Sequence, residues 1–248
     1  MLFSNAEIDN ICPDSIPLDQ PLWARKHSLK ELQVLQEGDK YTFASQSQQN
    51  PRPYGGLMFK DKYWKHYDLL PSDIDVWRIY GDTAQKVQEQ NDYSVFQFWA
   101  RSPSSGIYLV DQIRGKWEAP QLESMLVEFW NKHKPNQYKP FGAQLVKVED
   151  KSSGSSLIQS IKQNYLIPIE GIPRNKDKVF RAMGVVKYFD AGYIHLPKNV
   201  PWVSDYKDEF MKFSPLMTHK FDDQIDPTMD AVEDLLVFGD QLYSKHSM

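Results

Sequence analysis

The apolar residues of this chain occur in an order that only a few folds accommodate. Three strand-like runs follow one another with short connections: DVWRIYGD (75–82), YSVFQFWAR (93–101) and GIYLVDQIRGKW (106–117). Short connections favour antiparallel neighbours, so these runs predict a three-stranded meander. A helical pattern then covers 120–133, where proline opens the first turn and apolar side chains recur on one face.

The second half of the pattern alternates strands with helices. Its expected elements are a strand over 142–149, a helix carrying Leu157, Ile158 and Ile161, a strand over 166–172, a helix over 176–191, a strand over 193–197, a helix over 204–212 and a last helix from Asp223 onward. A parallel strand–helix–strand unit after an antiparallel meander is the order of the ribonuclease H-like fold. The expected fold class is therefore α/β, with a ribonuclease H-like mixed β-sheet flanked by helices.

Acidic residues stand at three places where the pattern predicts the end of a strand or the mouth of a helix. These residues are Asp82, the pair Glu149 and Asp150, and the pair Asp222 and Asp223. Parallel crossovers are strongly right-handed, which brings the ends of the first and fourth strands together. We therefore expect Asp82 and Glu149 to be neighbours, with Asp223 reaching them from the mouth of the last helix.

Carboxylates held close together repel one another unless a cation compensates their charge. The hard divalent ions Mg²⁺ and Mn²⁺ take oxygen ligands, and a pair of such ions roughly 3.5–4 Å apart is a common device for phosphodiester hydrolysis. The three acidic positions thus predict a metal-dependent nuclease. Two of the three positions also have a structural interpretation: Asp82 as a turn or cap residue, and Asp222 with Asp223 as the N-cap and first turn of a helix.

The first part of the chain differs in composition from the rest. Pro, Gln and Asn are frequent in 1–72, where we expect one helix over 28–37 whose start carries a capping box formed by Ser28 and Glu31. We interpret 1–72 as an irregular N-terminal tether and 73–248 as one main domain, since 248 residues lie near the upper limit of single-domain size.

Charge and cysteine content narrow the function classes. The net charge of −4 gives no bulk attraction to a polyanion, so any nucleic-acid surface must be local. The single cysteine, Cys12, allows no intramolecular disulfide and no cysteine-based zinc site. The six histidines show no HxH or HExxH spacing. No stretch approaches 18 apolar residues and no signal-peptide pattern is visible, so we expect a cytoplasmic protein and no membrane partner.

The motifs together resemble one known family, the C-terminal nuclease domain of the large terminase subunit of tailed bacteriophages and prophages, a DNA-packaging protein. The resemblance runs from about Leu22 to Leu236. The segments that carry it are YGDTAQK (80–86), NDYSV (91–95), VKVEDKSSG (146–154), DKVFRAMG (177–184), AGYIHLP (191–197) and HKFDDQIDPTMDA (219–231). Residues 22–33 and 42–60 resemble the stretch between the ATPase and nuclease domains of that family.

The chain contains no GxxxxGK[ST] loop, so the ATPase domain of the family is absent from this sequence. An excised domain, a separately encoded nuclease and a truncated prophage relic are all compatible with this. The partners that the resemblance implies are double-stranded DNA, the portal protein, the terminase small subunit and the ATPase domain, in the host cytoplasm and transiently at the procapsid.

The resemblance implies an endonuclease that cuts concatemeric viral DNA with two Mg²⁺ or Mn²⁺ ions. Carried over to this chain, Asp82 bridges both ions, Glu149 binds one, and Asp223 completes the other, with Asp222 behind it. Asp226, one helical turn beyond Asp222, is a further candidate ligand. Asp92 is a candidate to orient a water molecule on a metal ion, with a structural aspartate at the start of a strand as the alternative. Asp150 is expected to point to the other face of its strand.

Basic residues near these motifs are candidates for holding DNA phosphates. They are Lys86, Lys151, Arg174, Lys176, Lys178 and Arg181. A solvated helix face is the structural alternative for the last four.

Other functions remain compatible with the sequence. They are a non-catalytic DNA-gripping or portal-docking module, a resolvase or transposase of the same fold, and a metal hydrolase for small substrates. One geometric test distinguishes the nuclease from a gripping module. A shared ion requires that three carboxylates, those of Asp82, Glu149 and Asp223, lie within about 4–6 Å of one point.

Overall fold

The computed structural model describes residues 28, 31, 58–84, 93–138, 140–213 and 222–237. The chain divides into two compact units, Met1–Met58 and Phe59–Met248. In the first unit, the Ser28 amide donates to Glu31 Oε2 at 2.9 Å and the Glu31 amide donates to Ser28 Oγ at 3.3 Å. These reciprocal bonds confirm the capping box; the remainder of the expected helix lies outside the described residues.

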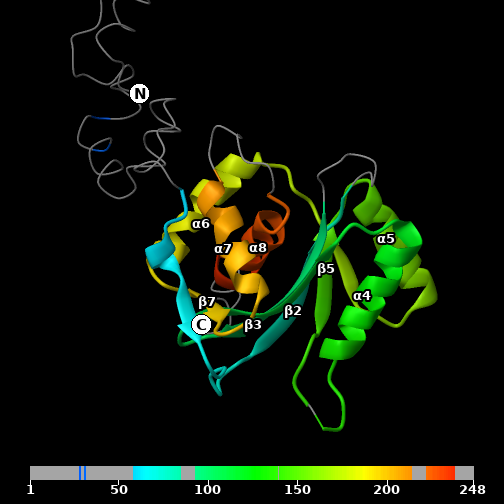
Figure 1. Ribbon diagram of the computed structural model, residues 1–248. Coiled ribbons are helices and arrows are strands. Elements are labelled where there is room, and N and C mark those ends of the chain that lie inside the picture. The colour runs from blue at the N-terminus through cyan, green and yellow to red at the C-terminus, as the bar shows by residue number, and fades with distance from the viewer. Residues whose placement is uncertain are drawn as a thin grey trace, which may run out of the picture. The chain divides into compact units, whose positions relative to one another are not determined.

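The second unit is built on a seven-stranded mixed sheet with the strand order β1-β7-β4-β3-β2-β5-β6 (Figure 1). Its strands are β1 (Lys65–Tyr67), β2 (Val76–Asp82), β3 (Ser94–Ser102), β4 (Gly106–Gly115), β5 (Leu145–Glu149), β6 (Ile169–Ile172) and β7 (Ile194–Pro197). The predicted meander is confirmed, because β3 pairs antiparallel with both β2 and β4. The predicted extension is confirmed as well, because β5 runs parallel to β2 and β6 runs parallel to β5.

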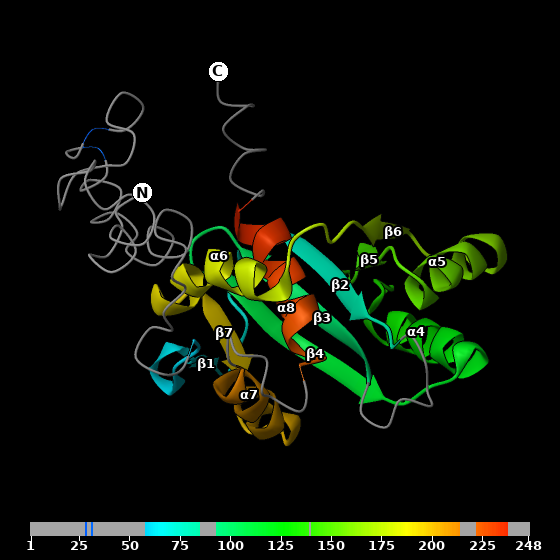
Figure 2. The same ribbon diagram turned by 90° about the horizontal axis from the view of Figure 1, so that it is seen from above.

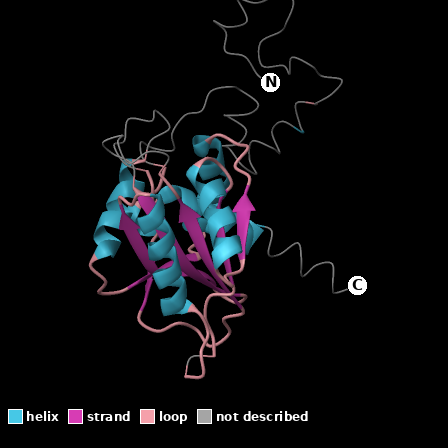
Figure 3. Ribbon diagram, turned by 90° about the vertical axis from the view of Figure 1, so that its right-hand side faces the viewer, coloured by secondary structure: helices cyan, strands magenta, loops and turns pink. Residues whose placement is uncertain are grey.

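Helices cover both faces of the sheet, as the views in Figures 1, 2 and 3 show. On one face lie α4 (Ala119–His133) and α5 (Ser153–Asn164); on the other lie α6 (Lys178–Asp190), α7 (Trp202–Lys212) and α8 (Ile225–Val232). A short 3₁₀ helix, η3 (Asp61–Tyr63), precedes β1, and a π-helical turn, η4 (Glu233–Val237), continues α8. The mixed sheet flanked by helices is therefore the architecture that the sequence predicted.

Among the described helices, none is both long and apolar enough to span a membrane.

Apolar packing fixes the sheet between these layers. The alternating side chains of β2 and β3 that face α4 and α5 form one core with Leu126 and Ile161, both fully buried. On the other face, Phe59 and Trp64 pack edge-on against aromatic rings of α6 and α7. Burial on both faces explains why β3 has no exposed residue.

The expected start of the main domain at Asp73 needs correction. The second compact unit begins at Phe59, and β1 extends the sheet beside β7 with Lys65 opposite His195. Polar and turn residues dominate the sequence up to residue 56, which hid the short apolar stretch that follows. Phe59 and Trp64 are buried at 0% and 5% exposure, so this stretch belongs to the core.

The Trp64→Ala variant tests this boundary. The Trp64 ring contacts Phe189, Tyr206 and Phe210 at centroid distances of 5.2–5.6 Å. Its truncation therefore leaves a cavity in the aromatic packing between the sheet and helices α6 and α7. We expect the free energy of unfolding to fall by about 3–5 kcal/mol, measured by urea denaturation. Leu69→Ala is the control, since that side chain is exposed and its truncation should change stability little. Equal, small effects of both variants would contradict the assignment of this stretch to the core.

Candidate active site

Two carboxylates end neighbouring parallel strands on the face that α8 covers. In the register of β2 and β5, Gly81 lies opposite Val148, so Asp82 and Glu149 follow side by side at the carboxyl ends of the strands. This confirms the expected neighbourhood of the two acids. Gly154 lets α5 begin directly behind them, because a Cβ at that position would lie 2.0 Å from the carbonyl oxygen of Glu149.

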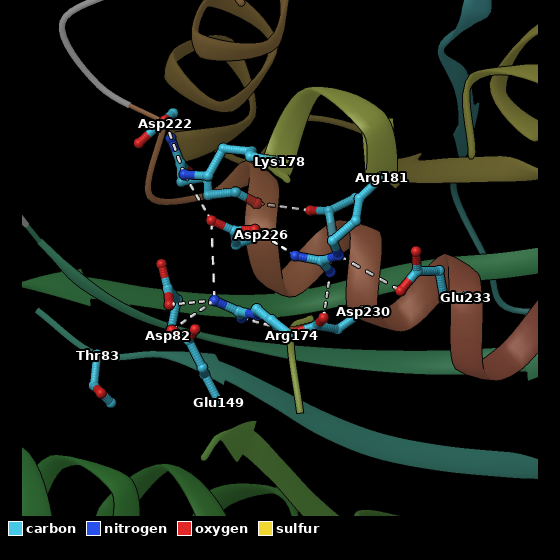
Figure 4. A network of polar contacts seen from close by, with 12 residues as sticks. Asp82, Thr83, Glu149, Arg174, Lys178, Arg181, Asp222, Asp226, Asp230 and Glu233 are labelled. Atoms are coloured by element: carbon cyan, nitrogen blue, oxygen red, sulfur yellow. Dashed lines mark hydrogen bonds and ion pairs between the residues drawn. The ribbon is translucent and has the colours of Figure 1, made fainter. Parts of the chain in front are cut away.

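The guanidinium of Arg174 lies between these strand carboxylates and α8 (Figure 4). Its Nη1 donates to Asp82 Oδ1 at 2.7 Å and to Glu149 Oε2 at 3.1 Å. Its Nη2 donates to Asp230 Oδ2 at 2.6 Å, and Nη1 lies 3.9 Å from Asp226 Oδ2. Only 7% of the Arg174 side chain is exposed. One cation therefore joins carboxylates from two strands and one helix.

On the helix side, Asp226 and Asp230 occupy one face of α8, one turn apart. Asp226 is held by Lys178 and by Arg181, each at 2.6 Å, and Asp230 is bonded by Arg181 as well as by Arg174. Lys178 also reaches Asp222 at 2.8 Å. Both helix carboxylates are thus enclosed by cations from the start of α6 and from the loop before it (Figure 4).

Burial and charge shift the acidity of these groups in opposite directions. Burial raises the pKa of the Asp82 carboxyl to about 6, although the Arg174 guanidinium opposes this shift. Burial also raises the pKa of Asp230. Burial acts in the same sense on Asp226, but Lys178, Arg174 and Arg181 outweigh it and hold the pKa of Asp226 below its ordinary value. The charge of Asp82 is therefore less compensated than that of Asp226.

The structure separates Asp223 from this cluster. Asp223 Oδ2 accepts from Arg114 at 3.0 Å and its Oδ1 accepts from the backbone amide of Tyr93 at 3.2 Å. The same Arg114 nitrogen lies 3.2 Å from Glu209. The predicted convergence therefore holds for Asp82 and Glu149, while Asp226 and Asp230 supply the helix carboxylates that we expected from Asp223.

The start of α8 explains this difference. Asp226 and Asp230 lie four positions apart on one face of the helix, whereas Asp223 precedes the helix, which begins at Ile225. Asp230 was not among the predicted site residues, although its i, i+4 spacing from Asp226 is visible in the sequence. Asp222 pairs with Lys178 at the edge of the cluster, at 26% exposure.

The residues expected to hold DNA phosphates fall into different environments. The structure buries Arg174 and Arg181 in ion pairs, with 7% and 4% of their side chains exposed, so neither presents a free surface cation. Lys151 and Lys176 are exposed, beside the ends of β5 and β6. Lys86 and Asp92 lie outside the described residues. Phosphate binding remains a prediction for these side chains.

The carboxylates around Arg174 are the kind of oxygen donors that bind a divalent ion, but they are not arranged around a metal position. Oxygens of Asp82, Glu149 and Asp226 lie 2.7, 3.1 and 3.9 Å from one cationic nitrogen, Arg174 Nη1, so this structure already brings three carboxylates to one positive charge. Within the described residues, however, no group of three or more His, Cys, Asp or Glu side chains is arranged to hold a metal ion. The strand carboxylates are oxygen donors of the kind that a divalent cation takes, and both are bonded to Arg174.

A second ionic cluster holds the end of α8 on the same sheet face. Asp234, in η4, accepts from Tyr80 at 2.6 Å and from Lys147 at 2.9 Å, and also from Arg78. Tyr80 and Lys147 precede Asp82 and Glu149 by two residues on their strands, so they point to the same face. This cluster fixes the position of α8 along the direction of the strands, relative to their carboxyl ends.

A family model describing the terminase RNaseH-like domain matches residues 79–235, more than half of the 248 residues. The chain belongs to this family. The matched range begins in β2 and ends in η4, so it contains both strand carboxylates and the acidic face of α8. This bears out the resemblance to terminase nuclease domains. No curated protein matches the chain in sequence.

Solved structures of terminases share its fold. The large terminase of a thermophilic bacteriophage matches with a TM-score of 0.54 and 14% identity, over 72% of this chain and 44% of that one. The large terminase nuclease of thermophilic phage G20c with bound magnesium matches with a TM-score of 0.50 and 13% identity, over 71% of this chain and 96% of that one. The match therefore spans less than half of the length of the first of these proteins, and this chain has the ribonuclease H-like fold.

We expect the Asp82 carboxyl to titrate near pH 6 in the metal-free protein, because burial raises its pKa to about 6. This pKa in the folded state lies above the ordinary value of 3.8, so the native state holds a proton that the unfolded chain has lost. The contribution of this group to stability should therefore fall as pH rises from about 4 to about 6. Carboxyl ¹³C NMR measures the titration, with Asp82→Asn to assign the signal. A midpoint below about pH 4 would contradict the burial argument.

Proposed function

We propose that this protein is a divalent-metal-dependent endodeoxyribonuclease that cuts concatemeric viral DNA during genome packaging. The observation that carries the proposal is the convergence of Asp82 and Glu149 on one cationic nitrogen at the carboxyl ends of parallel strands, in a chain of the terminase RNaseH-like family. The magnesium in the G20c nuclease structure supports a hard divalent ion here. Mg²⁺ and Mn²⁺ are the ions that such an oxygen-donor set favours.

In this proposal Asp82 and Glu149 hold the ion, since their side chains are 17% and 22% exposed and face the solvent side of the cluster. When bound there, a divalent ion would act as a Lewis acid that lowers the pKa of a water molecule and offsets the negative charge of the phosphate. Asp226 and Asp230 hold Arg174, which bonds both strand carboxylates, and Arg181 pairs with the two helix acids. Lys151, exposed beside Glu149, is placed to contact a DNA phosphate.

The partners follow from the family and belong to the same proposal. Double-stranded DNA is the substrate, and the packaging ATPase, the portal protein and the terminase small subunit are the protein partners, in the host cytoplasm. The resemblance implies two metal ions, but a second ion would have to enter where the guanidinium of Arg174 lies.

A non-catalytic DNA-gripping module is the alternative that one observation favours. Arg174 pairs with both strand carboxylates without any metal, as it would in a protein that retains these acids for stability alone. Metal-dependent cleavage distinguishes the two functions, because a gripping module has no use for a divalent ion.

Plasmid cleavage by the purified protein tests the proposal. We expect nicking and linearisation with Mn²⁺ or Mg²⁺, none with EDTA, and loss of cleavage in Asp82→Asn and Glu149→Gln, because each variant removes a charged oxygen donor. Asp150→Asn is the matched control: Asp150 adjoins Glu149 but accepts from Ser155 at 2.8 Å, outside the cluster. No cleavage by folded wild-type protein with either metal would favour the gripping module.

The helix acids give a separate prediction. We expect Asp226→Asn to lower the cleavage rate by about 10- to 100-fold, because Asp226 lies beside the Arg174 nitrogen that bonds Asp82 and helps to orient it. Asp223→Asn should stay close to wild type, since Asn at that position can still accept from the Tyr93 amide. Single-turnover cleavage rates of both variants measure this. A larger loss in Asp223→Asn than in Asp226→Asn would restore the original expectation that Asp223 is the ligand.

A further inference from the structure

We infer that Arg174 replaces one of the two metal ions that the resemblance implies, so that the site takes a single divalent ion, held by the oxygens of Asp82 and Glu149 that Arg174 does not bond. The inference rests on the proposed function and deepens it. It concerns the number of ions and the residue that sets this number.

The position of the guanidinium is the first argument. Arg174 Nη1 lies 2.7 Å from Asp82 Oδ1 and 3.1 Å from Glu149 Oε2, while Nη2 lies 2.6 Å from Asp230 Oδ2. A planar, permanently charged fork of this kind bridges carboxylates that an ion would otherwise have to bridge. More than nine-tenths of the side chain is buried, and its Nε has no hydrogen-bond partner among the described residues. Arg174 is therefore held in the cluster by its terminal nitrogens alone, that is, by the carboxylates.

The helix carboxylates are the second argument. Asp230 has no exposed side-chain surface and is bonded by both Arg174 and Arg181. Asp226, at 7% exposure, is held at 2.6 Å by both Lys178 and Arg181. A second ion between the strands and α8 would have to break these buried ion pairs, and breaking one leaves an uncompensated buried charge.

The strand carboxylates are the third argument. Each uses one oxygen for Arg174, and the other oxygen, Asp82 Oδ2 or Glu149 Oε1, has no hydrogen-bond partner among the described side chains. Two carboxylate oxygens with water and a DNA phosphate are the ligand set that Mg²⁺ commonly takes in phosphoryl-transfer sites. One ion can therefore bind on the open side while Arg174 stays in place.

Charge balance agrees with a single ion. The cluster contains six carboxylates and three cations, a net formal charge of 3 − 6 = −3. The carboxylates are Asp82, Glu149, Asp222, Asp226, Asp230 and Glu233, and the cations are Arg174, Lys178 and Arg181. One divalent ion leaves −1 and two leave +1, so charge alone allows either number, but two ions would have to displace buried ion pairs to enter. Loss of Arg174 makes the net charge −4 and uncovers three oxygens, which is room for a second ion.

The test is the stoichiometry of Mn²⁺ on the full chain without DNA. Isothermal titration calorimetry should give one ion per chain for the wild type and two for Arg174→Gln. Electron paramagnetic resonance supplies an independent signature, because two Mn²⁺ ions about 3.5–4 Å apart are magnetically coupled and a single ion is not. Lys178→Gln is the matched control: it removes the same charge from the cluster, but Lys178 bonds Asp222 and Asp226 rather than the strand carboxylates, so the variant should keep one ion.

Two coupled ions in the wild type would overturn the inference, and so would one ion in a folded Arg174→Gln protein. If Arg174→Gln does not fold, the wild type and Arg174→Lys are compared instead. One ion in each of these proteins supports the inference, because lysine retains the positive charge. Two ions in either protein overturn it. Plasmid cleavage separates this result from the proposed function. Metal-dependent cleavage with two bound ions refutes the single-ion site but leaves the nuclease standing, whereas neither binding nor cleavage refutes both.

Discussion

The guanidinium of Arg174 is the contact on which the site depends. Its two terminal nitrogens join the ends of β2 and β5 to α8, elements that no short connection links. Without that cation, four carboxylates would face one another across the space between sheet and helix, and like charges in a buried site repel strongly. The loop after β6 therefore does more than connect a strand to a helix: it supplies the charge that lets an acidic helix lie on an acidic strand edge.

Two layers of ionic contact fix the position of α8. Asp234 is bonded by Arg78, Tyr80 and Lys147 near the middle of the strands, and Arg174 acts at the strand ends. Because α8 is held at two points along the strands, it cannot slide over the sheet without breaking either the contacts of Asp234 or those of Arg174. The continuation of α8 as a π-helical turn changes the angular position of Asp234 relative to Asp230, and π-helical turns frequently occur at functional sites.

The fold and half of the site could be predicted from the sequence because each depends on short-range rules. Strand alternation, helical spacing and right-handed crossovers brought Asp82 and Glu149 together. The helix acid was expected at Asp223, whereas the structure joins Asp226 and Asp230 to Arg174, because the sequence did not show that the helix begins only at Ile225. The position of this helix depends on ionic contacts of Asp226, Asp230 and Asp234 with residues far away in the sequence. The role of Arg174 was missed for the same reason: an arginine near a helix start looks like a surface cation until the loop is folded.

A group of acidic residues in the sequence predicts that a positive charge lies beside them in the folded protein, but not whether that charge is a metal ion or a basic side chain. A divalent ion and a guanidinium both satisfy carboxylates, yet they differ in consequence. An ion exchanges with solvent and brings water into the site, whereas Arg174 is tied to the chain and excludes water from Asp230, whose side chain is fully buried. The side chains of Asp82 and Glu149 are partly exposed, so they are the part of the cluster where an ion and water can exchange, and the buried acids of α8 act through the arginine that they hold.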